Sequence, residues 1–93
     1  MGLNEIKTTL RDYIREHYGI ADGDEDFTDD VHLFDYGYVD SFGAVDLIQF
    51  VESAFGVTVG TSDLVAYPLN TINEISDFVA ARIPGGVNAQ AGR

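Results

Sequence analysis

The sequence contains no cysteine, so it offers no disulfide framework, no thiolate nucleophile and no zinc–thiolate site. No stretch approaches the roughly 18 consecutive apolar residues that a membrane-spanning helix needs. The first residues lack the basic region and apolar core of a secretory signal. Gly2 is not followed by the hydroxyl residue of a myristoylation signal, because position 6 is Ile6. These absences predict a cytoplasmic protein that does not span a membrane.

Basic residues are also scarce. The 93 residues include 16 acidic side chains against 5 lysines and arginines, which gives a net charge of −11. Between Arg15 and Arg82 there is no lysine or arginine at all. Such a surface repels nucleic acids and anionic lipids, and it attracts basic protein surfaces. We therefore expect protein partners and no nucleic acid, although charge alone also fits an acidic protein that is merely soluble.

Hydrophobic periodicity predicts an all-α domain: a four-helix bundle with three long helices, one short helix and a long first loop. The predicted helices cover residues 3–18, 42–55, 64–66 and 72–83, around one core. Gly19 and Gly56 are expected to end the first two helices. Thr71 and Glu74 have the spacing of a capping box, which marks the start of the last helix. The domain is thus expected to span residues 1–83, followed by a disordered tail at 84–93.

The loop at residues 19–40 is too acidic to be buried as a whole. Its expected anchors to the core are Phe27, Val31, Leu33 and Phe34. Three of its acids, Asp22, Asp24 and Asp26, match the first three ligand positions of an EF-hand loop. Phe27 and Leu33 occupy the positions that require glycine and glutamate, so no specific metal site is expected. Weak divalent-ion binding is left open.

Two histidines are candidates for acid–base chemistry. His17 lies on the apolar face of the first helix, where a partly buried histidine is usual, and His32 lies in the loop. Neither is placed by sequence to activate Ser41, and no serine lies in a Gly-x-Ser-x-Gly elbow. A triad assembled in space is not excluded by sequence. Catalysis is not expected, because a helical domain of this size should offer little cavity for a substrate.

The second helix carries an unusual polar face. On a helical wheel, two apolar side chains fall among polar and acidic ones, in the set Phe42, Val45, Asp46, Gln49 and Glu52. Exposed apolar residues ringed by acids suit a partner-docking surface. Scattered surface apolar residues, which are common, are the alternative explanation.

The pair Asp40-Ser41 lies where the loop becomes the second helix. One of the two side chains is expected to cap that helix by accepting its free amide hydrogens. A serine at a helix start is exposed, and the helix dipole favours a phosphate bonded there.

The surrounding stretch resembles the signature of acyl and peptidyl carrier proteins, Leu-Phe-x-x-Gly-x-x-Asp-Ser-Leu. The matching positions are Leu33, Phe34, Gly37, Asp40 and Ser41. The sequence departs from the signature at Phe42, where the family usually has leucine or methionine. The resemblance extends over roughly residues 3–83, because the helix lengths, the long first loop and the short third helix also fit.

This resemblance implies that 4′-phosphopantetheine from coenzyme A is esterified to Ser41. Asp40 would orient the serine or help a transferase to hold a metal ion. Cargo would be held as a thioester on the arm's thiol, which would explain how a chain without cysteine carries acyl groups. The implied partners are a phosphopantetheinyl transferase, a loading ligase or acyltransferase, and downstream synthases that dock on the second helix. Gly43 stands where fatty-acid carriers often have an acid, so the docking face is less charged here.

The sequence is thus interpreted as a monomeric, free-standing acyl or aminoacyl carrier that is not itself an enzyme. An acidic helical interaction module without a cofactor and a weak divalent-ion binder are the alternatives. Fatty acyl, polyketide and amino-acid cargoes all stay open. The pattern leans toward D-alanyl and stand-alone aminoacyl carriers through residues 33–48 and 70–72.

Overall fold

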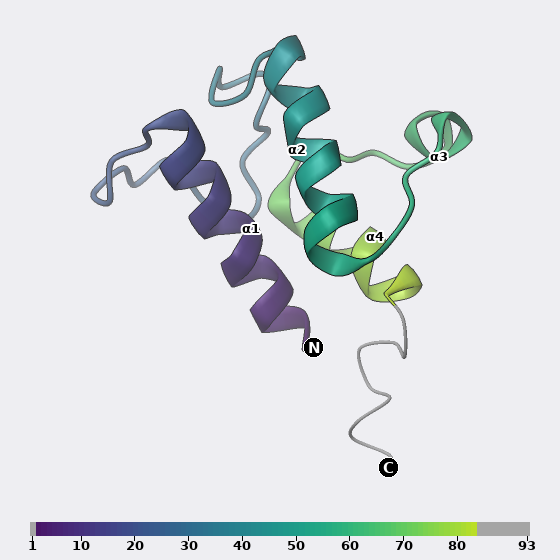
Figure 1. Cartoon of the computed structure of the whole chain (residues 1–93). Helices are drawn as coiled ribbons and strands as arrows, with labels where there is room; N and C mark the ends of the chain where they lie inside the picture. Colours follow the sequence, from purple (N-terminus) through teal and green to yellow (C-terminus); the bar gives the residue numbers. More distant parts are fainter. Residues whose placement is uncertain (1, 84–93) are drawn as a thin grey trace.

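The structure, a computed structural model, describes residues 2–83, and these residues form helices and loops without a strand. In chain order the helices are α1 (Leu3–Tyr18), α2 (Ser41–Phe55), α3 (Thr61–Ala66) and α4 (Ile72–Arg82) (Figure 1). The predicted all-α class is confirmed. The predicted tail at 84–93 lies outside the described residues. Within residues 2–83 no helix has both the length and the apolar character needed to cross a bilayer.

The helix ends follow local signals in the sequence. Gly19 and Gly56 end α1 and α2 in the left-handed conformation, with φ of 68° and 66°. At the start of α4, the Thr71 hydroxyl accepts the Glu74 amide at 3.0 Å, and the Glu74 carboxylate accepts the Thr71 amide at 3.1 Å. The predicted capping box is therefore confirmed.

The start of α3 was predicted three residues too late. The helix begins at Thr61, and Gly60 is its N-cap. The Asp63 carboxylate accepts the Gly60 amide at 3.0 Å, so Asp63 stabilises the first turn from inside the helix rather than preceding it. An acid in the first turn also interacts favourably with the helix dipole.

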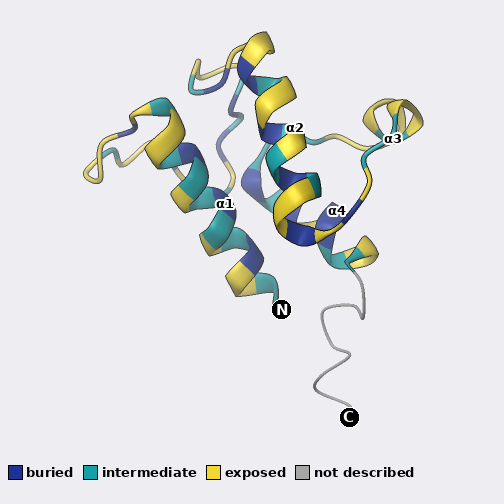
Figure 2. Ribbon diagram, in the orientation of Figure 1, coloured by how far each residue is buried: buried dark blue, intermediate teal, exposed yellow. Residues whose placement is uncertain are grey.

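Three helices and the first loop build the core. Ile6, Leu10 and Ile14 recur at i, i+4 and i+8 on α1 and are wholly buried. They form one stripe that packs along α4. The buried side chains of α2 and α4 are Leu47, Val51, Phe55, Ile72, Ile75, Phe78 and Val79. Figure 2 shows buried segments, in dark blue, on each of α1, α2 and α4. Each fully buried aliphatic side chain contributes about 1.5–3 kcal/mol.

The short helix α3 does not join this core. None of its residues is buried, and Val65 is 85% exposed. Figure 1 shows α3 standing away from the other helices, and Figure 2 shows it largely exposed. The prediction of four helices around one core is therefore wrong for α3. A six-residue helix with two flanking loops has too little apolar surface to replace the contacts of a full-length helix.

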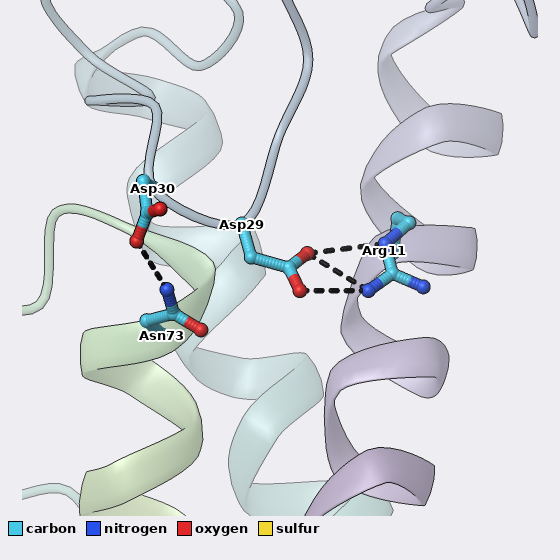
Figure 3. Close-up of polar contacts among 4 residues, drawn as sticks. All are labelled: Arg11, Asp29, Asp30 and Asn73. Carbon is cyan, nitrogen blue, oxygen red and sulfur yellow. Dashed lines mark hydrogen bonds and ion pairs between the residues drawn. The ribbon is translucent and has the colours of Figure 1, made fainter.

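The first loop is held at several points. Phe27, Val31 and Leu33 are buried, as predicted, whereas Phe34 is only partly buried. The Arg11 guanidinium on α1 binds both carboxylate oxygens of Asp29, with N–O distances of 2.8 and 2.9 Å (Figure 3).

The same part of the loop also binds α4. The Asn73 backbone amide donates to the Asp29 carbonyl at 3.0 Å. The Asn73 side-chain amide donates to the Asp30 carboxylate (Figure 3). Asp29 and Asp30 thus connect the loop to two helices, which limits how far the loop can move relative to the core.

Candidate functional site

The segment from Leu33 to Val39 leaves the core and returns to it. Both end residues are buried, and the Val39 amide donates to the Leu33 carbonyl at 3.1 Å. The Leu33 amide donates to the Asn70 carbonyl at 2.9 Å, which ties the segment to the start of α4. Between these anchors the chain turns at Gly37, whose φ of 79° is the conformation that glycine adopts without strain. Gly37 thus allows the chain to turn before it enters α2.

Asp40 and Ser41 follow directly at the start of α2. Asp40 is the N-cap residue, and its carboxylate accepts the Gly43 amide at 2.7 Å. Ser41 is the first helical residue and is exposed. Asp40, rather than Ser41, therefore provides the expected cap. The serine hydroxyl lies at the positive end of the helix dipole, next to solvent.

Neither histidine is positioned as a base for Ser41. His17 stacks on Tyr13 with ring centroids 5.0 Å apart, and its side chain is 44% exposed. Its Nε2 lies 3.9 Å from an Asp46 carboxylate oxygen. His32 Nδ1 accepts the Asp35 amide at 3.1 Å. Both imidazoles thus interact with groups other than the serine.

The acidic loop does not assemble an EF-hand. Both carboxylate oxygens of Asp24 are used inside the protein. One accepts the Asp26 amide and the other accepts the Tyr38 hydroxyl, each at 2.9 Å. Among residues 2–83 no group of three or more acidic or histidine side chains is arranged to hold a metal ion.

The outer face of α2 is open to solvent. Phe42 and Val45 are 84% and 56% exposed, and Asp46 and Gln49 are exposed beside them. Glu52 differs, because its carboxylate accepts the Val59 amide at 2.9 Å and it is only partly exposed. Glu52 therefore also holds the chain that leaves α2, a role that the helical wheel did not predict.

The opposite side of α2 borders a cavity of about 490 Å³. Its walls come from α2, α3, α4 and the segment between α3 and α4, and they include Leu47, Ile48, Leu64, Leu69 and Phe78. The expectation of little cavity was wrong, because α3 stands off from α2 instead of closing against it. The space is lined mainly by aliphatic and aromatic side chains and is continuous with solvent.

One arginine connects α3 to α4 beside this cavity. The Arg82 guanidinium lies 3.0 Å from an Asp63 carboxylate oxygen on α3. The same guanidinium stacks over the Phe78 ring at 4.4 Å and the Tyr67 ring at 5.4 Å. These polar and cation–π contacts replace the buried apolar contacts that α3 lacks.

A contact between α1 and α2 was not predicted from the sequence. The Tyr18 hydroxyl donates to the Gly43 carbonyl at 2.7 Å, two residues after Ser41. Burial, with smaller contributions from Tyr13, Asp46 and Asp40, raises the pKa of Tyr18 to about 12, so the hydroxyl stays a donor at neutral pH. The only sequence signal was Gly43 itself, a residue that weakens a helix and is seldom placed in one without a packing reason.

Comparison with known proteins identifies the family of this arrangement. The sequence matches the phosphopantetheine attachment site family over residues 8–79. The chain belongs to this family. A D-alanyl carrier protein of Streptococcus suis (strain 05ZYH33) is 38% identical over 71 residues, covering 76% of this chain and 86% of that protein. The D-alanyl carrier protein of Streptococcus mutans serotype c is 43% identical over 57 residues, covering 59% of this chain and 72% of that protein.

Membership of the phosphopantetheine attachment family confirms several of the predictions made from the sequence. The protein is a phosphopantetheine carrier, with a covalently attached 4′-phosphopantetheine as its cofactor, as the resemblance implied. It is a carrier and not an enzyme, because its relatives are named carrier proteins. Carriers of this kind work together with modifying transferases and loading ligases.

Proposed function

We propose that Ser41 is the residue that bears the 4′-phosphopantetheine arm, and that the protein is a free-standing carrier of aminoacyl groups. The assignment of the attachment site rests on the position of Ser41. This serine is exposed and is the first residue of a helix that its neighbour Asp40 caps. A phosphodiester at this position displaces no packed side chain and lies at the positive end of the helix dipole. When bound, the arm supplies the thiol that the chain lacks.

The chemistry required of Ser41 is a phosphoryl-type transfer. Its Oγ forms a bond to the phosphorus that bears pantetheine, and the pyrophosphate bond of coenzyme A breaks. The adenosine 3′,5′-bisphosphate part leaves, and the serine proton passes to a base of the transferase or to water. Within residues 2–83 neither histidine is placed to take that proton. A transferase must therefore supply both the base and the metal ion that neutralises the phosphates.

An intact-mass experiment tests the attachment site. The apo protein is incubated with coenzyme A, Mg²⁺ and a broad-specificity phosphopantetheinyl transferase. Wild type should gain the mass of one arm, and Ser41→Ala should gain none. Ser53→Ala changes another exposed serine of α2 and should be modified like wild type. A mass gain that persists in Ser41→Ala, or a wild type left unmodified by several transferases, refutes the assignment.

The proposed cargo is an aminoacyl group, with D-alanine as the first candidate, because the similar curated proteins are named D-alanyl carrier proteins. The cavity beside α2 favours a second candidate. D-Alanine adds a single methyl side chain, which cannot fill about 490 Å³ of mainly apolar space, whereas a medium-length acyl chain could.

Loading assays distinguish the two cargoes. The holo protein is offered D-alanine with ATP and a D-alanine–carrier ligase, and in parallel an acyl group with an acyl–carrier ligase. Gain of one alanyl group supports the aminoacyl carrier. Exclusive gain of the acyl group would favour the second candidate. Shifted amide resonances of Leu47 and Ile48 on acylation would then show that the chain enters the cavity.

The exposed face of α2 is the proposed docking surface, formed by Phe42, Val45, Asp46 and Gln49, with Glu52 at its edge. Its apolar centre and acidic rim suit a partner with an apolar pocket bordered by basic residues. Val45→Ser and Asp46→Asn should each raise KM for the carrier about 3- to 10-fold with a loading ligase. Asp12→Asn removes an exposed acid from α1 and serves as the charge-matched control. Unchanged KM in both α2 variants would place docking elsewhere.

We further propose that the carrier acts as a monomer in the cytoplasm, where coenzyme A and its transferases are found. Sedimentation of the holo protein at several concentrations tests the monomer. A mass that rises with concentration toward two chains would contradict it.

A further inference from the structure

The first turn of α2 contains a buried glycine among exposed residues. Ser41, Phe42, Val45 and Asp46 are exposed, whereas Gly43 is buried. The Tyr18 ring at the end of α1 covers Gly43. A Cβ on Gly43 would lie 2.8 Å from Tyr18 Cε1 and 2.9 Å from its hydroxyl oxygen, closer than van der Waals contact permits. The φ of Gly43 is not positive, so the backbone conformation does not require a glycine here. The glycine is needed instead because the Tyr18 ring approaches it so closely.

Both polar groups of Gly43 are held by side chains from outside α2. Its amide donates to the Asp40 carboxylate at 2.7 Å, and its carbonyl accepts the Tyr18 hydroxyl at 2.7 Å. A helical carbonyl at this position already accepts an amide one turn later, so the tyrosine uses the second lone pair of the same oxygen. The two bonds attach the turn that carries Ser41 to the preceding loop and to α1.

The aromatic and ion-pair contacts that join α1 to α2 within residues 2–83 lie further along α2. Tyr13 stacks on Phe50 with ring centroids 3.8 Å apart, about two and a half turns beyond Ser41. The His17–Asp46 approach is 3.9 Å and involves exposed side chains. Of these described contacts the Tyr18–Gly43 bond lies nearest to Ser41 along α2, and its length of 2.7 Å is that of a well-formed O–H···O hydrogen bond.

We infer that Tyr18 is a positioning residue for Ser41: its bond to the Gly43 carbonyl holds the first turn of α2 in the orientation in which a phosphopantetheinyl transferase can use the Ser41 hydroxyl. This inference rests on the proposed role of Ser41 as the attachment site. Transfer to phosphorus needs the attacking oxygen in line with the bond that breaks, and a misplacement of about 1 Å can cost on the order of 100-fold in rate. Tyr18 does not touch the reacting atoms and acts only through the turn.

Tyr18→Phe tests this inference because it removes the hydroxyl and keeps the ring over Gly43. Tyr13→Phe is the matched control, since Tyr13 is also a tyrosine of α1 that packs against α2, and its hydroxyl makes no hydrogen bond among the described residues. Single-turnover transfer with excess transferase gives a maximal rate constant and an apparent affinity. In Tyr18→Phe the maximal rate constant should fall about tenfold with apparent affinity within about twofold of wild type. Tyr13→Phe should match wild type in both.

Two further measurements distinguish positioning from general stabilisation. Amide hydrogen exchange at Gly43 should accelerate in Tyr18→Phe and not in Tyr13→Phe, while exchange in α4 stays unchanged. Gly43→Ala disrupts the same contact from the α2 side, because the added methyl group displaces the Tyr18 ring. This variant should slow transfer in the same way.

The outcomes separate this inference from the function on which it rests. A wild type that is modified at Ser41, together with a Tyr18→Phe rate constant within twofold of wild type, overturns the role of Tyr18 and leaves the attachment site intact. A lower apparent affinity with an unchanged maximal rate constant also overturns it, because Tyr18 would then contact the transferase. If the wild-type protein is never modified, both the proposed attachment site and the role of Tyr18 are refuted.

Discussion

The ion pair between Arg11 and Asp29 offers a quantitative test of how the first loop is held. Asp29→Asn keeps the size of the side chain and removes its charge and one of its two strong acceptor oxygens. The guanidinium then loses the bidentate geometry seen at 2.8 and 2.9 Å. The Asn73 amide bond to the Asp29 carbonyl is a backbone contact and is not removed by this change. The variant therefore reports on the ion pair alone.

The expected loss of stability follows from the exposure of the pair. Exposed ion pairs contribute about 0.2–1 kcal/mol, and hydrogen bonds to charged groups contribute about 1.5–3 kcal/mol. The Arg11 and Asp29 side chains are 31% and 27% exposed, which places the pair between these cases. We expect Asp29→Asn to lower the free energy of unfolding by about 1–2 kcal/mol. Loss of one acid from a chain of net charge −11 also relieves repulsion, so a control is needed.

Asp22→Asn is the control, because it removes the same charge from the same loop. The Asp22 side chain is 98% exposed and lies 3.7 Å from Arg15, so its change should stay within about 0.5 kcal/mol. Urea unfolding followed by far-UV circular dichroism measures both variants, and Arg11→Gln with the double variant completes a mutant cycle. If Asp29→Asn costs no more than Asp22→Asn, or if the cycle shows no coupling, the pair does not hold the loop.

Three further predictions concern the cap, the core and the tyrosine. Asp40→Ala should cost about 1 kcal/mol in urea unfolding, and Asp40→Ser should restore most of it; equal losses in both would contradict the capping role. Ile72→Ala, at a wholly buried position, should cost about 2–5 kcal/mol, whereas Val65→Ala on α3 should change stability by less than about 0.5 kcal/mol. Because the pKa of Tyr18 rises from 10.0 to about 12 on folding, its contribution is complete below pH 10 and is lost between pH 10 and about 12. Unfolding of Tyr18→Phe should therefore depend less on pH in that range; an unchanged dependence would refute the assignment.

The helices could be predicted because their signals are local. Periodic apolar residues, the glycines after Tyr18 and Phe55, and the Thr71–Glu74 capping box lie within a few residues of the ends they set. Such signals act through backbone geometry and nearby hydrogen bonds, so they set the helix ends without any tertiary contact. The start of α3 was not predicted because its N-cap residue is Gly60. Glycine has no side chain that could accept an amide hydrogen, so the sequence carries no capping signal at this position.

The features of the candidate site also fall into those that could be predicted from the sequence and those that could not. Asp40 and Ser41 are neighbours in the chain, and their position at a loop–helix junction could be predicted from sequence. The exposure of Phe42 and Val45 followed from helical geometry alone. The cavity did not, because it depends on how far α3 stands from α2. Apolar periodicity says that a face is buried, but it does not say whether the neighbouring element is long enough to cover it.

The helical class, the helix ends at glycines and caps, and the motif around Ser41 all follow from the amino-acid sequence, because each depends on residues close together in the chain. The contacts between residues far apart in the chain could be seen only in the folded protein. Tyr18 lies against Gly43, Arg11 holds Asp29, and Arg82 holds α3 beside an open cavity. These pairs are separated by many residues and by loops whose path depends on the packing of the whole core. The way in which the first turn of α2, with Ser41, is held against α1 is therefore a tertiary property of the fold, whereas the choice of Ser41 as a candidate attachment point comes from the sequence.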